Sequence, residues 1–427
     1  MSILPNIAII GAGPGGLTLA RFLQQGNVPF QIFELDEDPI ARNQGGTLDL
    51  LPELGQLAIR AAGLYEEFSK RARFEGDCVK LVIPNGTVVL DEATYQAKTK
   101  SLGGRPEIDR LELRLMLLCS LRPEAVRWGH KLLQVEPHAP NSVAKRETYT
   151  LHFNVSGELH QEGPFDIVIG ADGAHSKVRP LLTDQQPFYC DITSIRSIAL
   201  NVDEKKKWLA NYVGPGSCYM FDEGRSIVAQ RNGDGSIRVY ACLRQPKEWL
   251  HTCGIDWTIP NEARKQLVDQ YFSDCAVEIK RIILDADDEL GYRYMEMLPI
   301  GLSWAPRGGV TLIGDAAHLM TPFGGKGVNA ALYDAMELGQ ALVHGIGKNQ
   351  GVDGAIQELA LYEKCMFERN RGLAQVTLHQ MELCFSRDGS EKLAKIMTSP
   401  REPAPTPEVE EDAKVQTEGG RAMTASI

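Results

Sequence analysis

The chain has 427 residues, of which 43% are hydrophobic and 24% are charged, values typical of a soluble globular protein with two or three structural units. Its net charge of −11 argues against a nucleic-acid partner, and no apolar run approaches the roughly 20 residues of a membrane span. The nine cysteines form no C-x-x-C pair, which indicates reduced thiols, no metal centre and a cytoplasmic protein.

The first 35 residues predict a strand, a tight turn and a helix. The β-branched run Ile7–Ile10 is typical of a buried strand, and the turn after it has the spacing Gly11-x-Gly13-x-x-Gly16. Such glycines permit a tight bend and the close approach of a pyrophosphate, which the next helix N-terminus stabilises. Glu34 ends the second strand, where its carboxylate can bind ribose hydroxyls and disfavour a 2′-phosphate. These residues predict a dinucleotide site; the alternative is an ordinary glycine-rich turn.

Polar residues then flank two adjacent glycines at positions 45 and 46. Arg42 and Asp49 stand on either side of this loop, and the residues alone favour a solvated surface position for each over a contact with a ligand. Asp109 is a suitable N-cap for a helix over 111–121. Arg110 then lies in the first turn, where a cation opposes the helix dipole. We therefore expect the Arg110 side chain to form either a salt bridge or a contact with an anionic or ring ligand.

The middle of the chain has the pattern of a β-rich unit. Alternating runs at 192–201, 226–230 and 237–243 predict a largely antiparallel sheet, and the last two flank a strong hairpin signal at 232–235. A smaller hairpin is predicted over 79–90. We expect this sheet to lie over the nucleotide-binding unit.

Two further strand ends carry glycine and aspartate. Asp172 follows the predicted strand 165–170, and Asp315 follows the predicted strand 310–313. Helices are predicted over 329–345 and 355–385, and the composition after Pro400 predicts disorder. His318 could act as an acid or base or serve as a structural hydrogen-bonding group, and the sequence favours the second.

Taken together, the three glycine-bearing strand ends resemble the single-component, class A FAD-dependent monooxygenases, the aromatic hydroxylase family, over residues 1 to about 385. The stretches 45–50 and 106–110 look most like the tetracycline-inactivating members. The resemblance implies an α/β fold: a discontinuous Rossmann-like FAD-binding domain of the glutathione-reductase type, a β-sheet substrate domain and a long C-terminal helix. The implied boundaries are 1–75, 105–185 and 301–350 for the FAD-binding domain, 76–104 and 186–300 for the substrate domain, 351–390 for the helix and 391–427 for a disordered tail.

The resemblance also implies site residues. It places the aspartate matching Asp315 on the ribityl hydroxyls of FAD, the arginine matching Arg42 on the reductant, and the residues matching Asp49 and Arg110 on FAD. The residues assigned to cofactor binding are Gly11, Gly13, Gly16, Glu34, Arg42, Gly46, Asp49, Arg110, Asp172, Asp315, Pro322, Gly325, Gly327, Val328 and Asn329.

The chain departs from the tetracycline-inactivating pattern in two places. Lys326 stands where that subgroup has glutamine; it could bring a cation to the flavin or point to solvent. The substrate block matches poorly, and its candidate contacts are Arg196, Tyr219, Arg238 and Phe323. The two arginines would suit an anionic, enolic or phenolic substrate, or could be charges on a strand surface.

The implied activity is that of an FAD-dependent, NADPH-consuming monooxygenase. The flavin carries the chemistry through a C4a-hydroperoxide formed with O2, so no catalytic side chain is expected, and the substrate would be a tetracycline-like or other secondary-metabolite polycycle, phenol or enol. NADPH would bind transiently, since the sequence has no second glycine fingerprint. The alternatives are a flavoprotein reductase or dehydrogenase without oxygen insertion and a non-catalytic FAD-fold binding protein. We expect no nucleic-acid or membrane partner, and a monomer or weak dimer.

Overall fold

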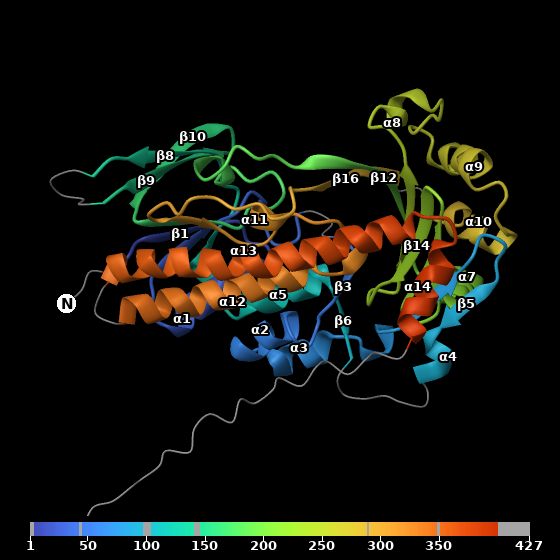
Figure 1. Ribbon diagram of the computed structural model, residues 1–427, viewed down its shortest axis with the longest axis horizontal. Coiled ribbons are helices and arrows are strands. Elements are labelled where there is room, and N and C mark those ends of the chain that lie inside the picture. The colour runs from blue at the N-terminus through green and yellow to red at the C-terminus, as the bar shows by residue number, and fades with distance from the viewer. Residues whose placement is uncertain are drawn as a thin grey trace, which may run out of the picture.

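The computed structural model describes residues 4–41, 45–96, 104–140, 146–287, 290–347 and 351–399. A five-stranded parallel sheet, in the order β17–β11–β1–β2–β7, forms the centre of the first unit (Figure 1). Its strands are β1 (Ile7–Ile10), β2 (Phe30–Phe33), β7 (Val126–Arg127), β11 (Ile167–Gly170) and β17 (Val310–Leu312). The strands β1, β11 and β17 are buried throughout, as expected for a parallel sheet covered on both faces.

The helices and 3-10 turns follow one another along the chain. They are α1 (Pro14–Gln25), α2 (Gly55–Ala61), α3 (Tyr65–Arg71), η1 (Phe74–Gly76), α4 (Glu92–Gln96), α5 (Arg110–Cys119), η2 (Pro123–Ala125), η3 (Arg179–Leu181), α6 (Val202–Lys205), α7 (Lys207–Val213), α8 (Trp249–Thr252), α9 (Pro260–Tyr271), α10 (Val277–Leu284), α11 (Asp315–His318), η4 (Pro322–Gly324), α12 (Gly327–Gly345), α13 (Gly351–Cys384) and α14 (Gly389–Thr398). Within the described residues, no helix is long and apolar enough to cross a membrane.

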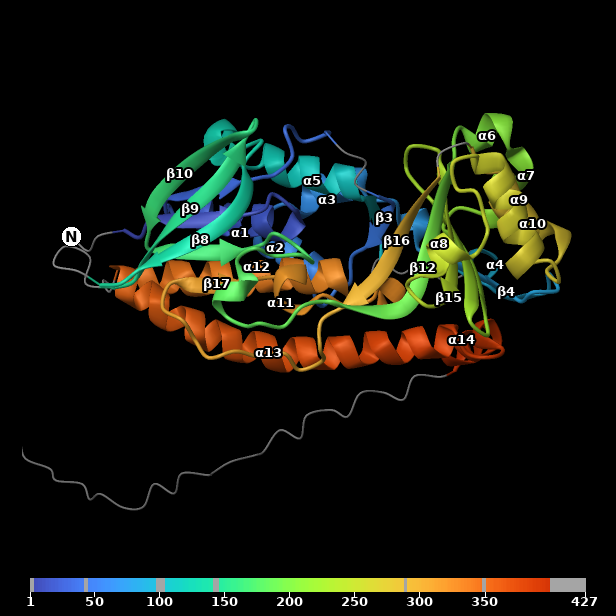
Figure 2. The ribbon, with the colours of Figure 1, turned by 90° about the horizontal axis from the view of Figure 1, so that it is seen from above.

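The parallel sheet is covered on one face by α1 and α12 and on the other by a three-stranded antiparallel sheet (Figure 2). That small sheet contains β8 (Lys131–His138), β9 (Thr148–Val155) and β10 (Glu158–Phe165). Phe33 of the parallel sheet stacks on Phe153 of the small sheet with ring centroids 4.7 Å apart. The predicted α/β fold is confirmed by this arrangement.

A second unit is built on a seven-stranded mixed sheet. Its order is β16–β12–β15–β14–β13–β4–β5. The strands are β4 (Val79–Val82), β5 (Val88–Asp91), β12 (Phe188–Ala199), β13 (Ser217–Asp222), β14 (Arg225–Arg231), β15 (Ile237–Arg244) and β16 (Leu290–Met297). Both predicted hairpins are present as antiparallel pairs, β4 with β5 and β14 with β15. A two-stranded ribbon of β3 (Thr47–Asp49) and β6 (Glu107–Asp109) lies between the units (Figure 2).

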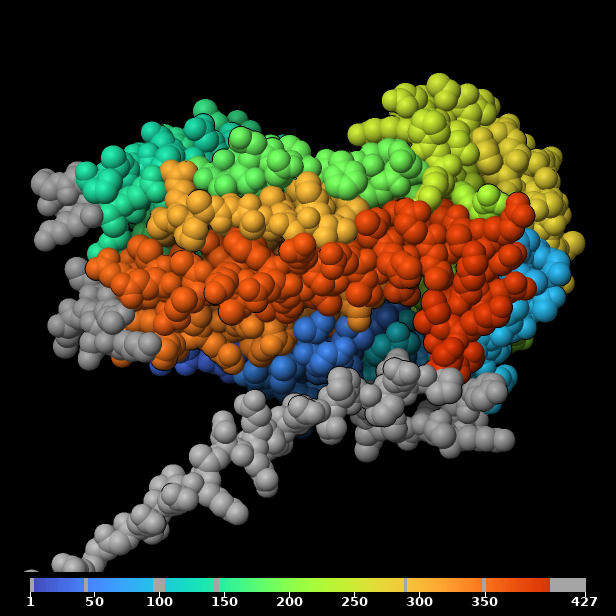
Figure 3. Space-filling model, viewed as in Figure 1, coloured from blue at the N-terminus to red at the C-terminus, as the bar shows by residue number. Residues whose placement is uncertain are grey.

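The two faces of the seven-stranded sheet have different neighbours. One face packs against α7, α9 and α10 around residues such as Val82, Met220 and Val239. The other face shares a hydrophobic cluster with the C-terminal end of α13 that includes Phe221 and Phe385. The long helix α13 therefore runs across both units (Figure 3) and joins them.

The expected start of the disordered tail at residue 391 is wrong for residues 391–398, which belong to α14. This helix buries Leu393 and Ala394 in the same cluster as Phe221, and the Ser390 hydroxyl accepts a hydrogen bond of 2.8 Å from the Phe221 N–H. Its few apolar residues are enough because they pack on an existing sheet. Residues 400–427 lie outside the described residues.

Candidate functional site

The glycine turn after β1 has the geometry of a phosphate-binding loop. A Cβ on Gly11, whose φ is +106°, would lie 2.4 Å from the Ala171 carbonyl oxygen, and a Cβ on Gly16 would lie 2.1 Å from the Gly11 carbonyl oxygen. Gly13 differs, because a Cβ there would meet nothing within 4 Å. The absence of a side chain at Gly11 and Gly16 thus lets neighbouring backbone segments pack closely. Gly13 instead borders open space at the N-terminus of α1, where an anion is stabilised.

The Glu34 carboxylate is buried beside this turn. Its Oε2 accepts a hydrogen bond of 2.5 Å from the Ala12 N–H, and its Oε1 accepts one of 3.1 Å from the Asp36 N–H. Arg114, which the sequence reading missed, donates to the Ala12 carbonyl at 3.2 Å and to the Asp36 carboxylate at 2.9 Å. Glu34 and Arg114 therefore brace the turn, and the contact of Glu34 with ribose hydroxyls stays a prediction.

Asp315 has a carboxylate available for a ligand. It follows Gly314, whose φ is +60°, and the structure gives the partly exposed Asp315 side chain no hydrogen bond within the described residues. A Cβ on Gly327 would lie 3.8 Å from the Asp315 Oδ1, so the carboxylate lies beside the first turn of α12. Gly327 and Val328 lie in that turn, and Pro322 and Gly325 lie in the loop just before it.

His318 and Asp334 form a buried network behind this loop. The Asp334 carboxylate is bonded to the His318 Nε2 at 2.5 Å, to the Arg369 Nη2 at 2.7 Å and to the Gly314 N–H at 3.0 Å. Burial would raise the Asp334 pKa, but His318, Arg369 and the Gly314 N–H lower it to about 2. His318 is thus a structural hydrogen-bonding group, as the sequence favoured.

Asp172 follows β11, and Asp315 follows β17, the neighbouring parallel strand. Its Oδ2 accepts a hydrogen bond of 2.7 Å from the Lys177 N–H, while its Oδ1 is buried without a hydrogen-bond partner among the described residues. Burial raises the Asp172 pKa. Arg179, also missed by the sequence reading, donates to the carbonyls of Ala316 at 2.8 Å and Ala174 at 2.6 Å. It ties the two aspartate loops together.

The ribbon of β3 and β6 brings further predicted residues to this region. Asn329 is fully buried, and its Nδ2 donates to the carbonyls of Asp49 at 2.9 Å and Gly325 at 3.0 Å. Its side chain is therefore used within the protein, which leaves only its backbone for the predicted cofactor contact. A Cβ on Gly46 would lie 2.4 Å from the Gln230 Oε1, so this glycine marks a close contact with the seven-stranded sheet. Arg42 lies outside the described residues.

Arg110 begins α5 and faces the gap between the two units. Its N–H donates to the Gly46 carbonyl at 3.3 Å, and its side chain is accessible to solvent. The surrounding protein nevertheless lowers the Arg110 pKa by desolvation, while Tyr240 and Asp315 oppose that shift. The solvent-accessible Arg110 guanidinium thus lies near Tyr240 and Asp315 in the region between the two units, here named the cleft. Asp109 caps α5 without a side-chain bond, because its carboxylate accepts instead from the Gly233 N–H at 3.0 Å.

Three of the four candidate substrate residues share one face of the seven-stranded sheet. Arg196 pairs with Tyr240, and Tyr219 pairs with Val228, which in turn pairs with Tyr240. Since directly paired residues point to the same face, Arg196, Tyr219 and Arg238 lie on the face that contains Tyr240, opposite α7, α9 and α10. Phe323 reaches this face from the loop before α12, with its ring centroid 6.5 Å from that of Phe221.

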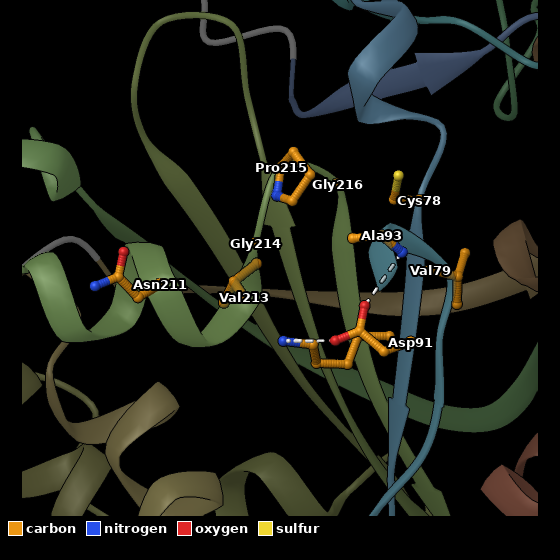
Figure 4. A pocket seen from close by; sticks show the side chains of 10 residues that line it. Cys78, Val79, Asp91, Ala93, Asn211, Val213, Gly214, Pro215 and Gly216 are labelled. Carbon is orange, nitrogen blue, oxygen red and sulfur yellow. Dashed lines mark hydrogen bonds and ion pairs between the residues drawn. The ribbon is translucent and has the colours of Figure 1, made fainter. Parts of the chain in front are cut away.

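A separate cavity of about 240 Å³ lies at the edge of the second unit (Figure 4). Lys80 and Asp91 form an ion pair of 3.3 Å in its wall, and burial raises the pKa of the Cys78 thiol to about 11. The thiol is therefore protonated at neutral pH and a poor nucleophile. None of the predicted cofactor or substrate residues lines this cavity.

The residues between the units fit FAD. Gly13 leaves room beside a helix N-terminus, Asp315 offers a carboxylate without a hydrogen-bond partner among the described residues, and α12 points a second helix N-terminus into the same region. These features suit a pyrophosphate, a polyol and the pyrimidine end of a flavin, respectively.

Comparisons with known proteins agree with this assignment. The family model of the FAD binding domain matches residues 5–357. Monooxygenase penA of Penicillium thymicola is 31% identical over 443 aligned positions, covering 92% of this chain and 98% of penA. HpxO of Klebsiella pneumoniae, solved with FAD and uric acid, has a TM-score of 0.68 at 22% identity over 92% of each chain. The tetracycline destructase Tet(51) has a TM-score of 0.60 at 17% identity, over 94% of this chain and 100% of that one.

The two structural similarities show the fold, and the family match covers most of the chain. The resemblance to class A flavin monooxygenases is thereby confirmed, and FAD is the cofactor of this fold. The chain belongs to the FAD binding domain family, among its FAD-dependent monooxygenases.

Proposed function

We propose that the chain hydroxylates a polycyclic, phenolic or enolic small molecule with NADPH and O2. The proposal rests on the contact between the loop before α12, residues 322–326 and here named the flavin loop, and the seven-stranded sheet. Phe323, next to the first turn of α12, packs toward Phe221, and Gly46 packs toward Gln230 and Tyr240. A substrate in this cleft would contact the sheet on one side and the flavin on the other.

When bound and reduced, FAD activates O2 and transfers one oxygen atom, so the protein supplies position, polarity and exclusion of water. Burial raises the pKa of the Tyr219 phenol. Tyr219 therefore stays protonated at neutral pH and can donate a hydrogen bond to a substrate oxygen. Phe221 and Phe323 form an apolar wall beside it, which suits the body of an aromatic ring system.

The test is a screen of phenolic and enolic polycycles, tetracyclines and other polyketides among them, for compounds that accelerate NADPH oxidation by the flavin-loaded protein. Each hit is then incubated with isotopically labelled O2 and analysed by mass spectrometry. We expect a product that contains one labelled oxygen atom.

Asp315→Ala is the matched control, since it should lose flavin and yield no product. NADPH oxidation that releases only peroxide, with every hit, would instead identify a flavoprotein reductase. NADH in place of NADPH tests the nucleotide preference in the same assay.

A further inference from the structure

We propose that the substrate binds as an anion, with its charged oxygen at an arginine cluster and its apolar body toward Tyr219 and Phe323. The arginine cluster consists of Arg110, Arg196, Arg238 and Arg293. This inference rests on the proposed function, because it concerns the substrate of the same cleft.

The strand register places three of these arginines on the cleft face of the sheet. Arg196 pairs with Tyr240, Arg238 pairs with Ile198, and Arg293 pairs with Ser194. Residues 194, 196 and 198 alternate along β12 and therefore share a face. The intervening residues of β12 and β15, such as Ile195 and Val239, belong to the cluster under α9 and α10.

Arg110 completes the cluster from the FAD-binding unit. Desolvation lowers its pKa, and the nearby charges of Arg293 and Arg238 lower it further. Tyr240 lies among the same groups, since Arg238, Arg110 and Arg196 all oppose the rise that burial causes in its pKa. The four guanidinium groups therefore share one neighbourhood, although they come from four separate elements.

Three of the four arginines of the cluster lack an ion-paired carboxylate within the part of the chain that the structure describes. No carboxylate among the described residues forms an ion pair with Arg110, Arg196 or Arg293, and the Arg196 Nη2 donates to the Tyr292 carbonyl at 3.4 Å. The Asp315 carboxylate, which lies at the proposed flavin site, raises the Arg110 pKa and so opposes the effect of desolvation. A chain with a net charge of −11 thus concentrates positive charge in this cleft, which attracts and holds an anion.

The opposite end of the same face is apolar. Tyr219, Val228 and Phe323 belong to the hydrophobic cluster around Phe221. A ligand with an oxyanion at one end and a ring system at the other would satisfy both ends. An ionised enol or phenol fits this description, and so does the phosphate of a pyridine nucleotide; the geometry favours the substrate because the apolar end continues beside the flavin loop.

The test is a spectral titration of the flavin-loaded protein, without NADPH, with a matched pair of bicyclic compounds. The enol 4-hydroxycoumarin is an anion at neutral pH, and 4-methoxycoumarin is neutral with the same rings. We expect the enolate to perturb the flavin spectrum with a Kd about tenfold or more below that of the methyl ether. Added NaCl should weaken the binding of the enolate and leave the binding of the methyl ether unchanged.

Arg196→Gln and Arg293→Gln should each raise the enolate Kd about tenfold and leave the methyl ether unchanged, while Arg196→Lys and Arg293→Lys should restore part of the loss. Arg387→Gln is the control, since this exposed residue pairs with Glu223 at the far end of the sheet. Equal binding of both compounds, or no enolate binding, overturns the inference.

A second titration distinguishes the nucleotide. If Arg196→Gln and Arg293→Gln raise the NADPH concentration needed for anaerobic flavin reduction but leave the enolate Kd unchanged, the cluster binds the nucleotide and the inference fails. The coumarin titrations involve no turnover. A negative result there would therefore overturn the anion inference without contradicting the proposed monooxygenase activity, which the labelled-oxygen experiment tests separately.

Discussion

Asn329 and Asp49, which are 280 positions apart in the sequence, are joined by a hydrogen bond of 2.9 Å from the Asn329 Nδ2 to the Asp49 carbonyl oxygen. The same amide accepts hydrogen bonds from the N–H groups of Leu51 at 2.8 Å and Gly55 at 3.2 Å. One side chain at the start of α12 thus fixes the segment after β3 against the proposed flavin loop.

Asn329→Ala should lower both stability and flavin affinity. The substitution leaves the buried partners of Asn329 without hydrogen bonds, which costs about 1–3 kcal/mol for such a group. Urea unfolding of the apoprotein and titration with FAD measure the two effects. Asn329→Asp keeps one acceptor oxygen but turns a second carboxylate oxygen toward the carbonyls of Asp49 and Gly325, so it should cost at least as much as the alanine substitution. Wild-type FAD affinity in Asn329→Ala would show that the segment is held by other contacts.

Asp315 and Asp334 should behave in opposite ways, although both lie near the same loop. The partly exposed Asp315 carboxylate has no hydrogen-bond partner among the described residues, so Asp315→Ala should fold with near-wild-type stability and lose its flavin. Asp334 is fully buried and bonded to Arg369 and His318, so Asp334→Asn should lower the free energy of unfolding by about 3–5 kcal/mol. Urea unfolding and flavin absorbance separate the two outcomes, and a coloured Asp315→Ala protein would contradict the assignment.

Gly13 and Gly16 form a second contrasting pair. A Cβ on Gly13 meets open space, whereas a Cβ on Gly16 would lie 2.1 Å from the Gly11 carbonyl oxygen. Gly13→Ala should therefore fold normally and bind FAD poorly, because the methyl group occupies the approach of the pyrophosphate. Gly16→Ala should fail to fold stably. Circular dichroism and FAD titration check both, and tight FAD binding by Gly13→Ala would place the pyrophosphate elsewhere.

The elements that the sequence predicted well carry their signals locally. The glycine turn after β1 and the hairpin at 232–235 are specified by residues within a few positions of each other, because tight turns need particular backbone angles. The start of the predicted disordered tail was wrong because α14 gains its stability from Leu393 and Ala394 packed on a distant sheet, and composition does not report such packing.

The missed site residues depend on distant partners in the same way. Arg114 donates to Asp36, 78 positions away, and Arg179 donates to Ala316, 137 positions away. A charged residue among buried leucines, as at Arg114 in α5, is the one sequence signal that could have been noticed. Arg293 could not be assigned to the cleft without the register of β16 against β12, since a shift of one residue reverses the face.

Lys326 should raise the reduction potential of the flavin. It is the N-cap of the 19-residue helix α12, where a cation opposes the helix dipole, and its charge lowers the pKa of the half-buried Asp49. Lys326→Gln should lower the midpoint potential by about 20 mV, which is about 1 kcal/mol for a two-electron couple, and Lys326→Arg should retain the wild-type value. Spectroelectrochemical titration measures the potentials. An unchanged potential in Lys326→Gln would mean that the side chain points to solvent.

Glu107 should make stability depend on pH. Burial raises its pKa from 4.5 to about 8, although Arg73 lies 2.6 Å away and opposes the shift. Between these two values the folded state binds more protons than the unfolded state, so the free energy of unfolding falls as pH rises through the window, by at most about 1.4 kcal/mol per pH unit for one proton.

Glu107→Gln cannot ionise and should flatten that part of the profile, measured by urea unfolding at a series of pH values. The control is Glu112→Gln, because Glu112 is half-exposed and its nearest basic partner, Arg71, is 3.7 Å away. If Glu107→Gln keeps the wild-type slope while Glu112→Gln also leaves it unchanged, Glu107 is ionised in the folded protein, and its bond to Arg73 outweighs its burial.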